Sequence, residues 1–298
     1  MSDDGAVTSP TPGPRTPAPS APAPRLIATD LDGTLLHDDK TVSPRTVAAL
    51  AAAEEAGVEV FFVTGRPARW MDVVSDHVHG HGLAICGNGA AVVDLHGGPG
   101  HHRFVKIREL PVPDALDVVR LLRAAAPGTS FAVERTGGLH HEPTYPPLHL
   151  DPGESVAPAE KLLTADREGS AVADQPVLKV LAFHPELGPD EFLALARAAV
   201  GDLAVITRSS PSALLEISGR SVSKASTLEL CCAERGISAA EVVAFGDMPN
   251  DMEMLAWAGT SYAMGNAHPD VLSAATGVTA TNNEDGVARV IESILAAR

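Results

Sequence analysis

The sequence predicts an α/β protein that has a parallel β-sheet core and a second domain inserted into it. Short apolar runs alternate with helical stretches near both ends of the chain, and this alternation is typical of βαβ units. Between about residues 88 and 215 the alternation is less regular, because Gly, His and Pro are frequent there. The two ends of the chain therefore build one core, and the middle of the chain builds the inserted domain.

The first part of the core alternates strands with helices. One helix begins after Ser43, because Ser is a favoured N-cap residue and Pro44 suits the first helical position, and it ends at Gly57. Another helical stretch extends from Pro67 to about Val78. Apolar runs predict buried strands at residues 26–29, 58–63 and 83–86.

The same alternation returns near the carboxyl end of the chain. A helix begins at Ser223 and stops at Gly236. A later helix has Asn250 as its N-cap and Glu253 three residues on, which is the spacing of a capping box. The sequence pattern also predicts strands at 177–183, 242–245 and 261–264, and helices at 250–257 and 284–297.

Residues 1–24 differ from the rest of the chain in composition. Seven of them are Pro, and most of the others are Ala, Ser, Thr or Gly. Such a segment buries too little apolar surface to offset the entropy that ordering costs, so we expect a disordered tail that favours polyproline II. The sequence thus divides into a tail at 1–24, a core at 25–86 and 216–298, and an inserted domain at 87–215.

The charge balance and the cysteine content argue against several classes of protein. The chain has 38 acidic and 22 basic residues and a formal net charge of −16, so nucleic acid and anionic membranes would repel it. No apolar run is long enough to span a bilayer. Its three cysteines are odd in number and lack CxxC spacing, which argues against a disulfide framework or a zinc site and favours the cytoplasm. The sequence indicates no obligate protein partner.

Carboxylates follow two of the predicted strands at the point where each strand ends. Asp30 and Asp32 come directly after the first strand, and Asp247 and Asp251 follow the strand at 242–245. A solvated pair in a turn is the ordinary interpretation of either group alone. Both groups would share the carboxyl edge of one parallel sheet, where α/β proteins place their sites. Close carboxylates need a cation to stay ionised, and oxygen ligands without Cys or His favour Mg²⁺.

Two further groups are suited to bind a phosphate. Thr64 and Gly65 follow another strand and offer a hydroxyl and an unobstructed backbone N–H. Lys224 stands at the predicted start of a helix and offers a positive charge. Each feature alone is weak, because Thr-Gly-Arg tripeptides are common, Arg66 is equally a surface cation at a helix start, and most lysines are solvated.

Together these groups resemble the motifs of the haloacid dehalogenase-like (HAD) hydrolase superfamily, and in particular its Cof-type subgroup. The resemblance covers the core at about residues 25–90 and 214–298, and it covers the middle of the chain by position and length. It implies a Rossmann-like parallel-sheet core with an inserted α+β cap of the C2 type. The motifs are, in chain order, Asp30-Leu31-Asp32-Gly33-Thr34, Thr64-Gly65-Arg66, Lys224 and Gly246-Asp247-Met248-Pro249-Asn250-Asp251.

The resemblance also implies a role for each of these residues. Asp30 is the expected nucleophile, which forms an aspartyl-phosphate, and Asp32 is the expected general acid and base. The expected Mg²⁺ ligands are Asp30, Asp32, Asp247 and Asp251. Asp32 would bind through its backbone carbonyl, and Asp251 would act through a water molecule or by orienting the groups that contact the ion. The expected phosphate-binding residues are Leu31, Thr64, Gly65, Lys224 and Asn250.

The implied function is a Mg²⁺-dependent phosphatase that hydrolyses small phosphorylated metabolites, such as sugar phosphates, in the cytoplasm. A phosphotransferase or phosphomutase on the same scaffold and a non-catalytic module that binds a phosphorylated ligand are the alternatives. The substrate depends on the cap, where Lys179 is either a solvent-facing strand residue or a residue aimed at the active site. His140 and His141 are expected at the cap surface, with substrate contact as the alternative.

Overall fold

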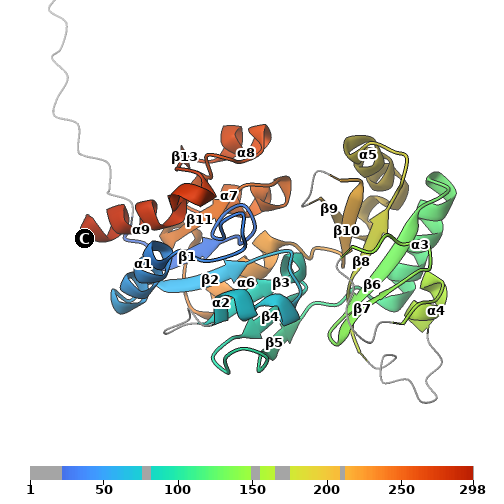
Figure 1. The fold of residues 1–298 in the computed structure, drawn as a ribbon, viewed down its shortest axis with the longest axis horizontal. Helices are drawn as coiled ribbons and strands as arrows, with labels where there is room; N and C mark the ends of the chain where they lie inside the picture. The colour runs from blue at the N-terminus through green and yellow to red at the C-terminus, as the bar shows by residue number, and fades with distance from the viewer. Residues whose placement is uncertain (1–21, 76–81, 149–154, 165–174, 209–211, 298) are drawn as a thin grey trace, which may run out of the picture.

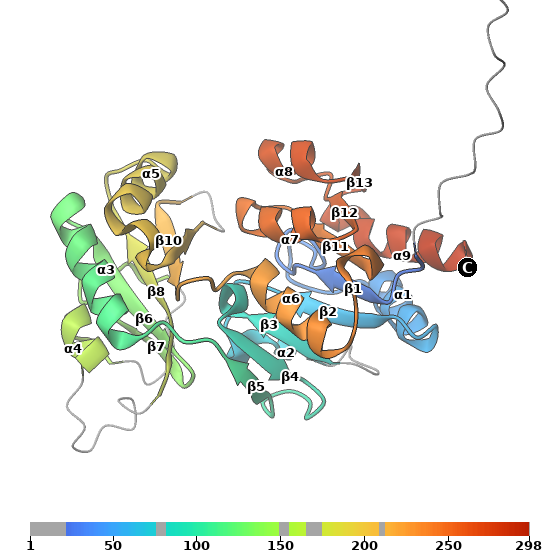
Figure 2. The ribbon, with the colours of Figure 1, turned by 180° about the vertical axis from the view of Figure 1, so that it is seen from behind.

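The computed structural model describes residues 22–75, 82–148, 155–164, 175–208 and 212–297. It contains two domains that lie side by side (Figure 1). Two segments connect them: one leads from β5 (Arg103–Ile107) to α3 (Val112–Ala125), and the other from β10 (Leu214–Ser218) to α6 (Lys224–Glu234). The view from behind shows the same division (Figure 2). The predicted tail at 1–24 lies almost wholly outside the described residues.

Within the described residues, eight strands form the sheet of the first domain, the core, in the order β13-β12-β11-β1-β2-β3-β4-β5. β1 (Leu26–Thr29) lies between β2 (Glu59–Val63) and β11 (Val242–Gly246). All pairs from β13 to β3 are parallel, which confirms the predicted parallel core, and β4 and β5 extend it in antiparallel fashion. The other core strands are β3 (Leu83–Cys86), β4 (Ala91–Asp94), β12 (Thr260–Ala263) and β13 (Gly277–Val278).

The helices of the core begin where the sequence provides caps. α1 (Pro44–Glu55) begins as predicted, because Ser43 Oγ accepts a hydrogen bond from the backbone N–H of Thr46 at 3.1 Å. Ser223 caps α6 in the same way. The other helical elements of the core are η1 (Ala68–Trp70), α2 (Asp72–Ser75), η2 (Gly87–Gly89), η4 (Ala239–Glu241), η5 (Pro249–Asp251), α7 (Met252–Trp257), α8 (Pro269–Ala274), η6 (Asn282–Glu284) and α9 (Gly286–Ala296).

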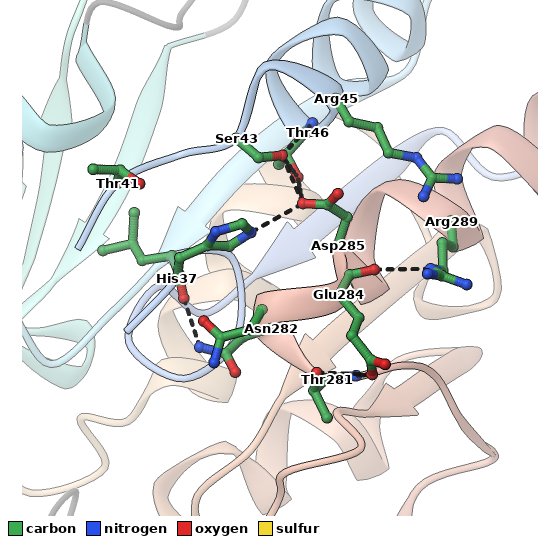
Figure 3. Close-up of polar contacts among 12 residues, drawn as sticks. His37, Thr41, Ser43, Arg45, Thr46, Thr281, Asn282, Glu284, Asp285 and Arg289 are labelled. Atoms are coloured by element: carbon green, nitrogen blue, oxygen red, sulfur yellow. Dashed lines mark hydrogen bonds and ion pairs between the residues drawn. The ribbon is translucent and has the colours of Figure 1, made fainter. Parts of the chain in front are cut away.

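The end of the chain is tied to the loop that follows β1 (Figure 3). Asp285, directly before α9, has a φ of +59°, and its Oδ1 accepts a hydrogen bond from Ser43 Oγ at 2.6 Å. His37 Nε2 lies 3.0 Å from the same oxygen. Asn282 Nδ2 donates to the backbone carbonyl of Leu36 at 2.9 Å. These contacts hold the loop that carries the first acidic motif against the start of α9.

The second domain, the cap, is α+β, as the sequence predicts. Within its described residues, five antiparallel strands form a sheet in the order β7-β6-β8-β10-β9. Its helices lie on the side away from the core, so the other face of the sheet is turned toward the core (Figures 1 and 2). The remaining cap elements are β6 (Ser130–Arg135), β7 (Gly138–His141), α4 (Ala159–Thr164), β8 (Val177–Phe183), α5 (Pro189–Val200), η3 (Gly201–Leu203) and β9 (Val205–Thr207).

The boundaries between the two domains differ from the predicted ones. β4 pairs with β3 and β5 pairs with β4 in the core sheet, so the chain leaves the core after Ile107 and not at residue 87. The turn Gly87-Asn88-Gly89 causes this difference, because all three residues have positive φ and reverse the chain. At the other boundary β10 pairs with β8 as far as Ser218, so the cap extends beyond residue 215.

The interiors of both domains consist mainly of aliphatic side chains. Cys86, Cys231 and Cys232 belong to the interior of the core as free thiols. Burial raises the pKa of each of these thiols, to about 12 for Cys86, so none of them is a reactive thiolate. In the described part of the chain, none of the helices has the length and apolar character needed to cross a bilayer.

Candidate functional site

The ends of three parallel strands bring polar side chains to one edge of the core sheet. Asp30 follows β1, Thr64 follows β2 and Asp247 follows β11. These strands are neighbours that point in the same direction, so the three residues meet at the carboxyl edge. All three are buried.

A cluster of three buried carboxylates lies at this edge. One ligand oxygen from each of Asp30, Asp247 and Asp251 lies within 4.8 Å of the others. Lys224, the first residue of α6, donates hydrogen bonds to Asp30 Oδ1 and to Asp251 Oδ1, both at 2.6 Å. Its side chain is only 1 % exposed, so water screens its charge very little. The structure thus brings together four residues that are up to 221 positions apart in the sequence, from 30 to 251.

The cluster contains more negative than positive charge, and the pKa values reflect this excess. Burial raises the pKa of Asp30 well above its ordinary value; Lys224 opposes this shift, and the charges of Asp251 and Asp247 add to it. Burial and the charge of Asp251 raise the pKa of Asp247 to about 7. Burial disfavours the charged form of Lys224, but its two carboxylate partners outweigh burial and raise its pKa. Buried oxygen ligands with surplus negative charge fit a hard divalent cation.

Gly33 allows the first acidic motif to approach the second. Its φ is +76°, and a Cβ at this position would lie 2.3 Å from Asp247 Oδ2. The next residue, Thr34, donates a hydrogen bond from Oγ1 to Asp247 Oδ1 at 3.0 Å. Any larger residue at position 33 would therefore push the turn away from the carboxylate cluster.

Asp32 lies in a different environment from the clustered carboxylates. Its side chain is 42 % exposed, and Arg66 donates to it twice, from Nε to Oδ2 at 2.5 Å and from Nη2 to Oδ1 at 2.7 Å. Lys40 Nζ donates to Oδ1 at 2.9 Å. Partial burial raises the pKa of Asp32, but Arg66 and Lys40 together outweigh burial and lower it to about 2. Arg66 is therefore a partner of the first motif and not a free surface cation.

Asp251, and not Asn250, fixes the turn that leads from β11 into α7. Asp251 Oδ2 accepts hydrogen bonds from the backbone N–H groups of Asp247 and Met248, both at 3.1 Å. The prediction that Asn250 is a helix N-cap is wrong, because Pro249 already begins a helical turn and places Asn250 inside it.

Side chains of the cap reach the core beside this edge. Lys179 on β8 donates to the backbone carbonyl of Gly65 at 2.8 Å and forms an ion pair with Glu216 on β10. Glu216 accepts a hydrogen bond from Asn88 Nδ2 at 2.9 Å, and Asn88 Oδ1 accepts one from Asn250 Nδ2 at 3.1 Å. Lys179 is therefore aimed at the core, which is the second of the two interpretations that the sequence leaves open.

Three other residues singled out in the sequence have buried side chains that take no part in the carboxylate cluster. His140 and His141 are buried within the cap, so the expectation that they lie at its surface is wrong. The backbone N–H of Ser155 donates to His140 Nδ1 at 3.0 Å, and the ring of His141 lies 6.1 Å from that of Tyr145. The side chain of Leu31 is packed in the hydrophobic interior of the core and does not line the cavity described below.

A cavity of about 520 Å³ lies over this edge of the sheet, between the core and the cap. This volume is in the range of sites for small molecules. Polar residues of the core, among them Asp30, Asp32 and Thr64, line one part of it. Apolar residues of the cap line another part, among them Leu139 and Leu181.

Sequence reasoning missed several residues that line the cavity. The rarity of their residue types could have singled out Trp70 and Tyr145, because the whole chain contains only two Trp and two Tyr. Arg69 and Glu134 line the cavity as an ion pair between core and cap, and the sequence gives no sign that the two residues meet. The apolar lining also carries no signal, since leucines on predicted strands indicate an ordinary hydrophobic interior.

Comparisons with known sequences extend over nearly the whole chain. A family model described as haloacid dehalogenase-like hydrolase matches residues 27–291. The pyridoxal phosphate phosphatase YbhA of Escherichia coli is 32 % identical over 277 residues, which cover 90 % of this chain and 97 % of that protein. The 5-amino-6-(5-phospho-D-ribitylamino)uracil phosphatase YitU of Bacillus subtilis is 30 % identical over 289 residues, which cover 89 % of this chain and 95 % of that protein.

The arrangement of core and cap is also similar to that of solved structures. A phosphatase of the haloalkanoate (HAD) enzyme superfamily from Bacteroides thetaiotaomicron matches with a TM-score of 0.75 and 23 % sequence identity. The match covers 94 % of this chain and 98 % of that one. At this identity the likeness shows the fold alone, and it extends to both domains.

Proposed function

Because the chain belongs to the haloacid dehalogenase-like hydrolases and is a phosphoric monoester hydrolase, we propose that it is a Mg²⁺-dependent phosphatase of small phosphorylated metabolites that acts through an aspartyl-phosphate. The observation that carries this proposal is the buried cluster of Asp30, Asp247 and Asp251 with Lys224, beside a cavity of metabolite size. The two relatives compared above are named for small phosphate esters, which supports the substrate class. We place the activity in the cytoplasm, where free thiols persist.

The cluster supports a bound Mg²⁺. Asp30 and Asp247 would hold the ion through their carboxylates, and Asp32 through its backbone carbonyl. Asp251 is engaged by Lys224 and by two backbone N–H groups, so its task in this proposal is to orient the turn that carries Asp247. When bound, Mg²⁺ supplies positive charge that offsets the anionic nucleophile and the phosphate.

Asp30 is the nucleophile in this proposal. Its carboxylate attacks the phosphorus, the ester bond to the leaving alkoxide breaks, and water then hydrolyses the aspartyl-phosphate to free phosphate. Lys224 contacts Asp30 Oδ1 and favours the ionised carboxylate that attacks.

Asp32 is the general acid and base. It gives a proton to the leaving alkoxide and later removes a proton from the attacking water. In the structure Arg66 and Lys40 hold Asp32 ionised. Asp32 must take up a proton before it can donate one. In this proposal the negative charge of the incoming phosphate draws Arg66 and Lys40 away from Asp32, and the pKa of Asp32 then rises.

The remaining groups bind phosphate oxygens, where the charge of the transition state is spread. Thr64 Oγ1 is held in place by the backbone N–H of Arg66 at 3.1 Å, and the amide of Asn250 is held by Asn88. Donors that are already fixed cost little reorganisation when the substrate binds. The assigned donors are the backbone N–H groups of Leu31 and Gly65 and the side chains of Thr64, Lys224 and Asn250.

The test is phosphate release from a panel of phosphate esters, with Mg²⁺ and with EDTA. We expect release with Mg²⁺ alone, and a loss of about 10³-fold or more in Asp30→Asn. The matched control is Asp270→Asn, an exposed aspartate on α8, which should keep full activity. Full turnover in Asp30→Asn would exclude Asp30 as the nucleophile. Isomerisation that needs a bisphosphate, without net phosphate release, would indicate a phosphomutase instead.

A further inference from the structure

The cap side of the cavity forms an apolar wall. We define the wall by five residues: Leu139 on β7, Leu181 on β8, Leu214 on β10, and Tyr145 and Leu148 from the segment after β7. All five belong to one hydrophobic cluster, which lies on the face of the cap sheet opposite the one that its helices cover. The wall is therefore one apolar surface, contributed by β7, the segment after it, β8 and β10.

The charged residues beside the wall are paired with each other or with the core. Lys179 forms an ion pair with Glu216 and donates to the carbonyl of Gly65. Glu134 forms an ion pair with Arg69 of the core. A ligand that needs many new hydrogen bonds here would have to break these buried pairs, which is costly.

The same cavity joins the wall to the carboxylates. Asp30 and Asp32 line it together with the wall residues, and so does Trp70. When the phosphate of an ester lies at Asp30, its leaving group therefore lies beside the wall. Sugar hydroxyls placed against leucine side chains lose their hydrogen bonds to water and gain none, whereas a flat ring buries its faces there favourably.

We propose that the leaving group of the substrate carries an aromatic or heteroaromatic ring, and that the wall is the surface on which this ring lies. This inference rests on the proposed phosphatase function and narrows its substrate class. The reaction is unchanged: the phosphoryl group passes from the ester oxygen to Asp30 and then to water, and the ring leaves as its alcohol with the proton that Asp32 donates.

The first test compares benzyl phosphate with glucose 6-phosphate and ribose 5-phosphate, which are all phosphate esters of primary alcohols. With Mg²⁺ present, we expect kcat/KM for benzyl phosphate to be at least about tenfold higher, the scale on which an apolar pocket discriminates. Equal or faster turnover of either sugar phosphate would overturn the inference and leave the phosphatase function standing. Failure to hydrolyse any ester would instead contradict the proposed function.

A binding measurement decides the inference even without turnover. Calorimetry with benzylphosphonate and with a phosphonate that carries a polyol chain, neither of which is hydrolysed, reports on the wall directly. We expect the benzyl compound to bind at least about tenfold more tightly. Equal affinities, or tighter binding of the polyol compound, would overturn the inference.

The second test changes the wall itself. In Leu181→Asn we expect KM for benzyl phosphate to rise about tenfold or more, with KM for glucose 6-phosphate unchanged or lower. Leu181→Met keeps an apolar surface and should keep the wild-type KM for both esters. This variant distinguishes a loss of apolar surface from a general defect caused by any substitution at position 181. The control Leu121→Asn replaces an exposed leucine on α3, far from the cavity, and should change neither KM. An equal loss toward both esters in Leu181→Asn would contradict a specific role of the wall.

Discussion

The carboxylate cluster and Asp32 show that one chemical group behaves in opposite ways at the same edge of the core sheet. Asp247 is buried beside Asp30 and Asp251, and its pKa rises to about 7. Asp32 is partly exposed and bound by Arg66 and Lys40, and its pKa falls to about 2. The difference teaches that burial and the balance of nearby charges, and not the residue type, set the pKa of each carboxylate.

This difference matches the division of labour in the proposed reaction. The cluster has one ammonium group, that of Lys224, and three carboxylates, so a bound divalent cation would offset its remaining negative charge. Asp32 already has two cations, so it needs a phosphate to draw them away before it accepts a proton. Each of the following predictions changes the balance of charge in one of these two regions.

The largest effect is expected when the cluster loses its lysine. Lys224→Met leaves Asp30 and Asp251 without their buried partner, so we expect a loss of about 3–5 kcal/mol in the free energy of unfolding at pH 7.5 in EDTA. Phosphate release should fall by about 10³-fold. Urea unfolding and steady-state kinetics measure the two quantities. A free energy of unfolding within about 1 kcal/mol of the wild-type value, which is roughly what a surface ion pair contributes, would contradict the claim that the buried carboxylates depend on the charge of Lys224.

The metal-free protein should become less stable as the pH rises through the neutral range. The pKa of Asp247 is about 7 in the folded protein and 3.8 in an ordinary setting, so the folded state binds more protons between these values. The stability that Asp247 contributes in EDTA should therefore be complete below about pH 4 and fall by roughly 2 kcal/mol or more by pH 7.5. Mg²⁺ should remove most of this fall.

The matched control for this pH dependence is Asp247→Asn, which cannot ionise at position 247. Its stability in EDTA should fall less steeply with pH than that of the wild type. Thermal unfolding at pH 5 and pH 7.5, with EDTA or Mg²⁺, gives all the required values. Rising stability of the wild type in EDTA over this range would contradict the raised pKa.

A smaller effect is expected when Asp32 loses its arginine. Arg66→Met removes two hydrogen bonds, so the pKa of Asp32 should rise from about 2 toward its ordinary value of 3.8. Because this pair is partly exposed, the loss of stability at pH 7 should be about 1 kcal/mol or less. The stability that the pair contributes is present above pH 4 and is lost as the pH falls through 2. Carbon-13 NMR titration of the Asp32 carboxyl checks the shift.

The smallest effect is expected at Lys40, whose side chain is 56 % exposed. Lys40→Met should raise the pKa of Asp32 less than Arg66→Met does, since Lys40 makes one hydrogen bond where Arg66 makes two. Its effect on stability should be about 0.5 kcal/mol or less. A larger pKa shift in Lys40→Met than in Arg66→Met would reverse the proposed ranking of the two cations.

Local signals in the sequence were sufficient for a large part of the core. Ser43 and Pro44 mark the start of α1, and the apolar runs mark β1, β2, β3 and β11, because these features depend on neighbouring residues. Once the parallel sheet is known, its carboxyl edge gathers Asp30 and Asp247 without further information. That Lys224 joins these residues was implied by the family resemblance alone, because α6 follows a strand of the cap and not a strand of the core sheet.

Features that depend on contacts distant in sequence could not be predicted. Arg66 reaches Asp32 across 34 residues, and Lys179 reaches the carbonyl of Gly65 across 114. The turn at Gly87-Asn88-Gly89 was not recognised as a hairpin, so the cap was expected to begin too early. The wall leucines resemble those of any hydrophobic interior until the sheet order shows which face of the cap is turned to the core.

The most direct test of the central claim is to identify the phosphorylated residue. We suggest rapid acid quench of the enzyme during turnover with Mg²⁺, followed by peptide mass spectrometry. The account predicts one phosphoryl group on Asp30, absent from Asp30→Asn. Phosphate on any other residue, or turnover at full rate with no phosphorylated enzyme, would contradict it.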